Sequence, residues 1–259
     1  MLVEMSSLVA VCETTSWSKP ASITNFLLSQ QECGELQTFR LKWKFWWDGS
    51  HLDAWLRTAA ARKVKELDLR ICTYGENLKL PPSFLSCTTL VVLKLSETIA
   101  LDIDTPSLSF NFPSLKKLLV AISLRSIIYS QETSFLKLLS GCPVLEDLSC
   151  TIELFEREYK TCVPTLKRLG IHATDFSNFG YELEINAPAL EHFEFYGDLR
   201  NIKFYEKLNN LVQADVYISI FDYVPEEFRW KWVFNLFAAL NNIKFLSFSP
   251  RGPEVRSPS

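Results

Sequence analysis

The side chain in this 259-residue sequence that most resembles a catalytic nucleophile is Cys142, in the segment SGCPVL. A cysteine attacks a substrate as its thiolate, and it usually needs a neighbouring base such as histidine to reach that state. No histidine lies near Cys142 in the sequence. Cys142 follows a glycine at a predicted helix end and precedes a proline at the start of a repeat, so we interpret it as a structural residue.

Two carboxylate pairs could serve general acid–base chemistry. Asp102 and Asp104 share one face of an extended run, but nothing beside them could act as a nucleophile or orient a base. Glu226 and Glu227 follow Pro225 in the first turn of a predicted helix, where they complement the helix dipole. The sequence contains no GxGxxG, GxxxxGK[ST], HExxH or GxSxG motif. We therefore expect no enzyme activity, no catalytic residue and no cofactor.

Basic and aromatic residues interleave in one run, LKWKFWW (41–47). Binding of single-stranded nucleic acid needs such stacking platforms together with a positively charged track. The formal net charge is −3 and no second run of this kind occurs, so we expect no nucleic-acid partner. We interpret Trp43, Trp46 and Trp47 as residues that pack over the first strand and cover the open end of a sheet; some of them could instead contact a protein.

The composition indicates a folded protein, because 47% of the residues are hydrophobic and 22% are charged. Seven cysteines without a CxxC pair do not suggest a disulfide framework. The first residues, MLVEMSSLVAVCETT, lack the features of a signal peptide, and no apolar stretch is long enough to span a bilayer. We expect a cytoplasmic or nuclear protein that has no membrane partner.

The strongest signal in the sequence is a repeat of the pattern apolar-x-x-apolar-x-apolar. Nine copies occur between Leu36 and Phe248, and their first residues are 21 to 32 positions apart, close to the 20–29 residues typical of leucine-rich repeats. The anchors are Leu36/Phe39/Leu41, Val64/Leu67/Leu69, Leu90/Leu93/Leu95, Leu115/Leu118/Val120, Leu145/Leu148/Cys150, Leu166/Leu169/Ile171, Leu190/Phe193/Phe195, Leu211/Ala214/Val216 and Ile243/Leu246/Phe248.

The pattern predicts an α/β fold of the leucine-rich-repeat solenoid type. The last two anchors of each copy are two residues apart, so they face the same side of a short strand. Strands stacked in this way form one curved, predominantly parallel sheet, and each return on the convex side needs about a dozen residues or more. Pro113, Pro143, Pro164 and Pro188 each stand two residues before a first anchor, where they favour an extended start to the strand.

The convex returns are predicted to be partly helical and partly extended. HLDAWLRTAAARK is amphipathic, and Ser50-x-x-Asp53 resembles a capping box ahead of it. SFLKLLSG ends at Gly141, and Pro225 begins a segment with Phe228, Val233, Leu236, Phe237 and Leu240 facing inward. LDIDTPSLSF and YELEIN are predicted to be extended.

The repeat register also bears on metal binding. When the copies are aligned, His172 lies opposite Tyr196, and His192 lies opposite Arg168. The two histidines therefore do not converge, and the remaining one, His51, is remote in sequence. We expect no metal site.

Five segments carry a resemblance to a known family. They are LPPSFLSCTTLVVLKL (80–95), FPSLKKLLV (112–120), LLSGCPVLEDLSC (138–150), VPTLKRLGI (163–171) and INAPALEHFEF (185–195). They resemble the leucine-rich region of plant F-box/LRR proteins, many of which carry an FBD domain. The resemblance implies that the repeats select a protein substrate for an SCF-type ubiquitin ligase, in which an F-box docks on the Skp1 adaptor of the cullin.

The two ends of the chain depart from the family pattern. Residues 1–21 lack the helical leucine/proline pattern of an F-box, and SPRGPEVRSPS is too short for an FBD domain. We expect an N-terminal disordered or capping segment (1–21), a leucine-rich-repeat domain (22–249) and a disordered tail (250–259). Skp1 and cullin would then be partners only of a longer form that includes an F-box. The alternative is a free-standing repeat scaffold, or truncated relative, that binds a partner without any link to ubiquitin.

Strand residues that alternate with the anchors are predicted to point away from the core and to form a concave binding strip. The strip has basic residues toward the N-terminus, small or apolar residues in its middle, and acidic and aromatic residues toward the C-terminus. Its predicted partner-binding residues are Arg40, Lys42, Asp68, Arg70, Lys94, Ser96, Leu119, Ser149, Thr151, His172, Glu194, Tyr196, Asp215 and Tyr217.

Overall fold

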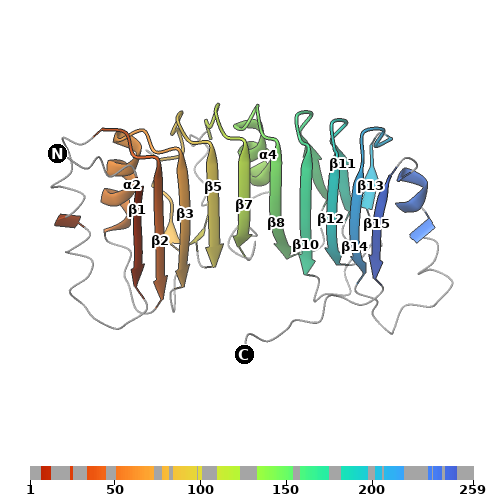
Figure 1. The fold of residues 1–259 in the computed structure, drawn as a ribbon, viewed down its shortest axis with the longest axis horizontal. Coiled ribbons are helices and arrows are strands. Elements are labelled where there is room, and N and C mark those ends of the chain that lie inside the picture. The colour runs from red at the N-terminus through yellow and green to blue at the C-terminus, as the bar shows by residue number, and fades with distance from the viewer. Residues whose placement is uncertain are drawn as a thin grey trace. The chain divides into compact units, whose positions relative to one another are not determined.

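A computed structural model describes sixteen stretches of the chain, which divide into two compact units, 1–144 and 145–259. The described residues are 7–12, 24–25, 34–44, 51–72, 78–81, 84–97, 99–100, 110–122, 133–153, 158–174, 182–197, 202–205, 207–218, 233–234, 236–240 and 243–249. Both units are built from stacked parallel strands (Figure 1).

The first unit contains one main parallel sheet with the strand order β1-β2-β3-β5-β7. Its strands are β1 (Ser7–Cys12), β2 (Thr38–Lys44), β3 (Glu66–Cys72), β5 (Val92–Glu97) and β7 (Lys117–Ile122). A separate short parallel pair joins β4 (Leu78–Lys79) to β6 (Ile99–Ala100). These pairings confirm the predicted parallel arrangement of leucine-rich repeats.

The second unit contains the parallel strand order β8-β10-β12-β14-β15. These strands are β8 (Asp147–Glu153), β10 (Arg168–Thr174), β12 (His192–Gly197), β14 (Gln213–Ile218) and β15 (Phe245–Ser249). A second parallel sheet has the order β13-β11-β9 and consists of β9 (Glu158–Cys162), β11 (Glu182–Asn186) and β13 (Ile202–Phe204).

The core of each unit is formed by the predicted anchors. All anchors of the first eight copies are buried, and none exceeds 4% exposure. The ring of Phe204, on β13, packs edge-on against Phe193 of β12 at 5.5 Å between centroids, so the second sheet of the second unit lies on the core side of the first. The ninth copy corrects the prediction. Leu246 aligns with the buried Ala214 but is 45% exposed, because the anchors of β15 are less completely covered.

Backbone hydrogen bonds tie neighbouring repeats together just before each strand. The carbonyl of Gln37 accepts bonds from the N–H groups of both Lys65 and Glu66, at 3.2 and 2.9 Å. The same double acceptance recurs at the carbonyls of Lys65, Val91, Glu146, Lys167, Glu191 and Val212. This repeated bond fixes the register of successive copies, and it therefore fixes which side chains lie beside one another on the sheet.

A tight turn precedes many of the strands, and the prolines that were predicted to favour an extended start lie within these turns. The N–H of Leu166 bonds to the carbonyl of Val163 at 3.1 Å, with Pro164 between them, and Leu115 and Leu190 form the same bond. Proline suits this position because its fixed φ matches the first corner of such turns. The residue that opens the turn is buried in each case, which the repeat pattern did not reveal.

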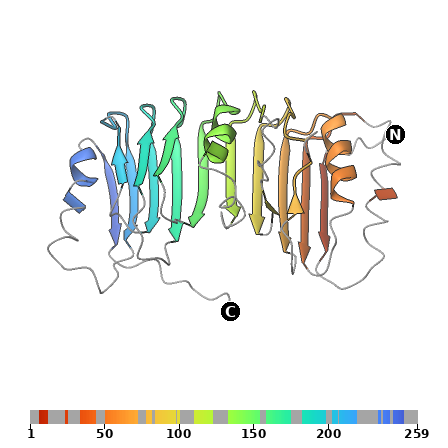
Figure 2. The ribbon, with the colours of Figure 1, turned by 180° about the vertical axis from the view of Figure 1, so that it is seen from behind.

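Helices α2 (Leu52–Ala61) and α4 (Thr133–Ser140) supply helical returns in the first unit and lie on the same side of its strands (Figure 2). Burial of Leu52, Trp55, Leu56 and Ala59 confirms the predicted apolar stripe of α2. The N-cap of α2 is His51, which makes no side-chain cap bond, and the Asp53 carboxylate pairs with Arg57 at 2.7 Å. Ser50, where a capping box was predicted, lies outside the described residues. The extended return YELEIN is confirmed as β11.

The N-terminal segment contains one strand that the repeat pattern did not predict. Strand β1 pairs with β2 over its full length. The first predicted strand is therefore not at the edge of the sheet, and Trp43 does not cover an open end. Trp43 is 4% exposed and packs against Trp55 at 6.4 Å between ring centroids. Trp46, Trp47, Phe228 and residues 250–259 lie outside the described residues.

Candidate protein-binding surface

The parallel register arranges the predicted strip residues in rows across each sheet. We call the sheet side that faces away from the buried anchors the open face. In the first unit, Arg40, Asp68, Lys94 and Leu119 form one row. In the second unit, Glu194 is flanked by Gly170 and Asp215, and the next row is Thr151, His172, Tyr196 and Tyr217. The open face of each unit is therefore a set of aligned polar and aromatic side chains.

Most predicted strip residues are accessible. Arg40, Arg70, His172 and Glu194 are exposed, and Asp68 differs because only 9% of its side chain is accessible. The side chain of Ser96 lies outside the described residues. The half-buried members are Lys42, Lys94, Leu119, Ser149, Thr151, Tyr196, Asp215 and Tyr217.

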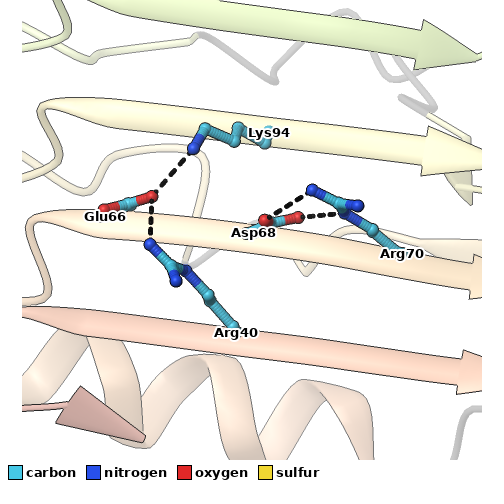
Figure 3. A network of polar contacts seen from close by, with 5 residues as sticks. All are labelled: Arg40, Glu66, Asp68, Arg70 and Lys94. Atoms are coloured by element: carbon cyan, nitrogen blue, oxygen red, sulfur yellow. Dashed lines mark hydrogen bonds and ion pairs between the residues drawn. The ribbon is translucent and has the colours of Figure 1, made fainter. Parts of the chain in front are cut away.

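The open face of the first unit carries a charge network centred on β3 (Figure 3). One carboxylate oxygen of Glu66 accepts hydrogen bonds from Arg40 Nη2 at 3.2 Å and from Lys94 Nζ at 3.0 Å. Asp68 accepts two bonds from the guanidinium of Arg70, at 3.1 and 3.2 Å. The network joins β2, β3 and β5 and holds the three cations in defined positions.

The pKa of the Glu66 carboxyl group depends on its two cationic partners, Arg40 and Lys94. Partial burial by itself would raise its pKa, but the hydrogen bonds from Lys94 and Arg40 and the charges of those two residues outweigh burial and lower the pKa below its ordinary value. Glu66 is therefore ionised at neutral pH, and its charge is shared by two cations.

The open face of the second unit is more acidic and aromatic. The rings of His172 and Tyr196 stack at 5.4 Å between centroids, and His172 Nε2 lies 3.9 Å from a Glu194 carboxylate oxygen. Beside them, Gln213 Nε2 donates a 2.7 Å hydrogen bond to Asp215. These contacts orient two carboxylates and one aromatic pair toward the same face.

Gly170 has no side chain, so the sheet surface is lower there than at the neighbouring Glu194. A Cβ atom added there would first meet Ser149 Oγ at 3.4 Å and then Glu194 Oε2 at 3.8 Å, which is ordinary contact distance. The row therefore has small residues at Ser149 and Gly170 beside the larger side chain of Glu194. A partner side chain could approach the backbone here.

The described residues provide no support for nucleophilic chemistry at the cysteines. Burial raises the pKa of the Cys142 thiol to about 12, and its Sγ bonds to the carbonyl of Leu138 at 3.2 Å. Cys150 is a buried anchor whose pKa burial also raises to about 12. Such thiols stay protonated at neutral pH and are poor nucleophiles. This agrees with the structural interpretation of Cys142.

The histidine register agrees with the alignment of the copies: His172 lies opposite Tyr196, and His192 lies opposite Arg168. Within the described ranges, no group of three or more histidine, cysteine or acidic residues could hold a metal ion. The carboxylate pairs Asp102/Asp104 and Glu226/Glu227 lie outside these ranges. Among the helices that the structure describes, none has the length and apolarity needed to cross a membrane.

A third row of open-face residues was not predicted from the sequence. Glu66 is two positions before Asp68 on β3, and it anchors the network although it was not predicted to belong to the strip. In the second unit, Asp147 and Arg168 stand directly opposite each other and form a 3.2 Å ion pair. The alternation of strand side chains, extended by two residues toward the N-terminal ends of the strands, would have identified this row.

Comparison with known proteins identifies a family model and several relatives that match this chain. A family model described as "FBD-associated F-box protein At5g56370, LRR repeats" matches residues 52–208. The chain is 35% identical over 156 residues to FBD-associated F-box protein At3g50710 of Arabidopsis thaliana, covering 56% of the chain and 35% of that protein. It is 31% identical over 191 residues to the Arabidopsis F-box/FBD/LRR-repeat protein At4g00160, covering 70% of the chain and 40% of that protein.

A third Arabidopsis relative, F-box/LRR-repeat protein At3g59190, is 32% identical over 197 residues, covering 73% of the chain and 48% of the relative. The matches with these three relatives span between about a third and a half of each relative's length. No solved structure matches the chain. The matched residues contain the anchors of the second to seventh copies and the strands from β3 to β13. The chain therefore belongs to the plant F-box/LRR family, and it corresponds to the leucine-rich-repeat region of that family.

Proposed function

We propose that this chain is the substrate-recruiting module of an SCF-type ubiquitin ligase and that it binds a protein on the open face of its parallel strands. The observation that carries the proposal is the arrangement of that face in a member of the F-box/LRR family. Polar and aromatic side chains stand in rows whose register is fixed by the backbone, while the anchors face the core. Repeat proteins commonly bind partners on such surfaces.

The contacts on the open face favour binding over catalysis. Its charged groups are engaged with one another in ion pairs, as Glu66 is with Lys94, and its aromatic rings stand beside hydrogen-bonding groups, as Tyr196 does beside His172. Tyrosine and arginine are the residue types that most often dominate protein interfaces. The module would act in the cytoplasm or nucleus, without a cofactor.

The names of the three reported relatives all contain the term F-box, and this supports the proposed link to a ubiquitin ligase. An F-box docks on the Skp1 adaptor of a cullin-based ligase. In the proposed arrangement, the F-box of a longer form would contact the adaptor, and the repeats described here would hold the substrate.

The experiment compares two tyrosines. Proteins captured from plant cells by the tagged chain are identified by mass spectrometry and compared with those captured by Tyr196→Ala and Tyr205→Ala variants. Tyr196 lies on the open face beside His172, whereas Tyr205 follows β13 on the opposite side of the sheet and is 67% exposed. We expect specific partners to be lost with Tyr196→Ala and retained with Tyr205→Ala. Equal capture by both variants would contradict binding through this face.

The link to ubiquitin needs its own measurement. The F-box of At4g00160 is fused ahead of the chain, and the half-life of a captured partner is followed in cells. A substrate-recruiting module should shorten that half-life, and the same fusion with Tyr196→Ala should not. Partner capture with an unchanged half-life would instead favour the free-standing scaffold.

A further inference from the structure

The open face of the first unit differs in charge from the chain as a whole. The chain has a formal net charge of −3. Among the described side chains at the outward positions of β2, β3, β5 and β7 there are five cations and two carboxylates. The cations are Arg40, Lys42, Arg70, Lys94 and Lys117, and the carboxylates are Glu66 and Asp68. A local excess of positive charge in an acidic chain is a feature of surfaces that attract anionic partners.

The two arginines of this face are more exposed than its carboxylates, and Lys94, whose side chain is 28% exposed, is only slightly more exposed than Glu66. The side chains of Arg40 and Arg70 are 48% and 57% exposed, whereas those of Glu66 and Asp68 are 23% and 9% exposed. Figure 3 shows the two carboxylates on β3, with Arg40 and Lys94 reaching Glu66 from the strands on either side. A partner that approaches this face therefore meets the guanidinium groups before the carboxylates.

The network leaves these cations with further bonding capacity. A guanidinium has five N–H donors and an ammonium has three. Arg40 and Lys94 each donate one hydrogen bond to Glu66, at 3.2 and 3.0 Å, and the bonds restrict where the two cations can lie. Holding a charged side chain in place before binding reduces the entropy lost when a partner binds.

We infer that the open face of the first unit binds an acidic segment of the recruited protein, with Arg40 and Lys94 as its central contacts. This inference rests on the proposed function and specifies the chemistry of the partner. The segment would be rich in aspartate and glutamate and would lie across β2, β3 and β5, where the two cations flank Glu66.

A nucleic-acid strand fits this face less well than an acidic protein segment. Bases bind single-strand surfaces by stacking on aromatic rings. The described open-face side chains of the first unit include no aromatic ring, and Trp43 on β2 faces the core. Nucleic acid of equal charge therefore serves as the competing probe in the test.

The test measures fluorescence anisotropy of a labelled peptide of alternating glutamate and serine with the full chain. The variant Arg40→Gln/Lys94→Gln should weaken binding about tenfold, because two surface ion pairs are lost. The matched control is Arg57→Gln/Lys63→Gln, which removes the same charge from two cations that also pair with carboxylates, Asp53 and Glu35, but lie off the open face. The control should change affinity by less than about twofold.

A third variant, Asp68→Asn, is expected to increase the affinity for the peptide. Asp68→Asn removes the carboxylate that binds Arg70, so it should strengthen binding of the glutamate peptide. Equal weakening by the two double variants, no binding of the peptide, or tighter binding of a single-stranded RNA of equal charge would overturn the inference. Loss of captured partners with Tyr196→Ala but not with Arg40→Gln/Lys94→Gln would also overturn it, while leaving the proposed function in place.

Discussion

The ammonium of Lys94 pairs with Glu66, a diagonal neighbour, rather than with Asp68, the residue directly opposite it in the register of β3 and β5. Arg40, on the other side, is likewise opposite Asp68 and also pairs with Glu66. Asp68 is occupied by Arg70 of its own strand. Glu66 is therefore the carboxylate that links three strands, and Asp68 is held within one.

This arrangement predicts a pH dependence for the variant Glu66→Gln. The pKa of Glu66 is lowered in the folded chain, so the ionised carboxylate stabilises the fold at pH values above its unfolded pKa, and this contribution is lost as the pH falls through the folded value. The difference in unfolding free energy between wild type and Glu66→Gln should be largest near neutral pH and should shrink below about pH 4. Urea denaturation at several pH values measures it.

Asp53→Asn is the control for that experiment, because it removes a carboxylate from an exposed pair with Arg57 on α2. Exposed pairs of this kind contribute about 0.5 kcal/mol or less. A difference between wild type and Glu66→Gln that stays constant from neutral to acidic pH would show that the ion pairs of Glu66 do not stabilise the fold.

Adjacent residues on β8 should respond very differently to truncation. Leu148 is a core anchor with 1% exposure, so Leu148→Ala should lower the unfolding free energy by about 2–5 kcal/mol. Ser149 points to the open face, so Ser149→Ala should change it by no more than about 0.5 kcal/mol. Denaturant midpoints of the two variants provide the comparison. Similar shifts for both would show that the two faces of the strand are assigned incorrectly.

Two glycines should differ in their tolerance of a methyl group. A Cβ at Gly141, which follows α4, would clash with the carbonyl oxygen of Phe110, so the backbone must move. Gly141→Ala should lower the unfolding free energy by about 1–3 kcal/mol. At Gly170 the nearest atom is 3.4 Å away, and alanine also suits a strand better than glycine. Gly170→Ala should therefore be neutral or slightly stabilising in thermal denaturation, and a loss as large as that of Gly141→Ala would refute this explanation.

The cysteines should differ in reactivity. Burial raises the thiol pKa of Cys142 and of Cys150 to about 12, whereas Cys162 at the end of β9 is exposed and unpaired by a disulfide. Iodoacetamide at mildly alkaline pH should modify Cys162 in the folded chain and leave the two buried thiols intact until denaturant is added. Peptide mapping by mass spectrometry identifies the modified positions. Rapid modification of Cys142 under native conditions would mean that its thiol is more accessible than this packing allows.

The repeats and the core residues could be predicted from the amino-acid sequence alone. The spacing of leucines, phenylalanines and isoleucines defines strands whose alternate side chains must be buried, because a strand has a period of two. The first eight sets of anchors are buried as predicted, and YELEIN and the apolar stripe of α2 also follow from local pattern. Aligning the copies was likewise enough to place His172 opposite Tyr196.

The pairing of the open-face side chains could not be predicted from the sequence, because it depends on their positions in the folded sheet. Arg168 lies opposite Asp147 in the register, and these two residues form an ion pair. Lys94 lies opposite Asp68 in the same way, but it pairs with the diagonal neighbour Glu66. Long charged side chains can reach several neighbours at similar cost, so the choice depends on which carboxylate is already occupied. Two further features could not be predicted from the repeat pattern: the pairing of β1 with β2 and the incomplete burial of Leu246 on β15. Both lie at the ends of a stack, where pairing and burial depend on segments without the repeat pattern.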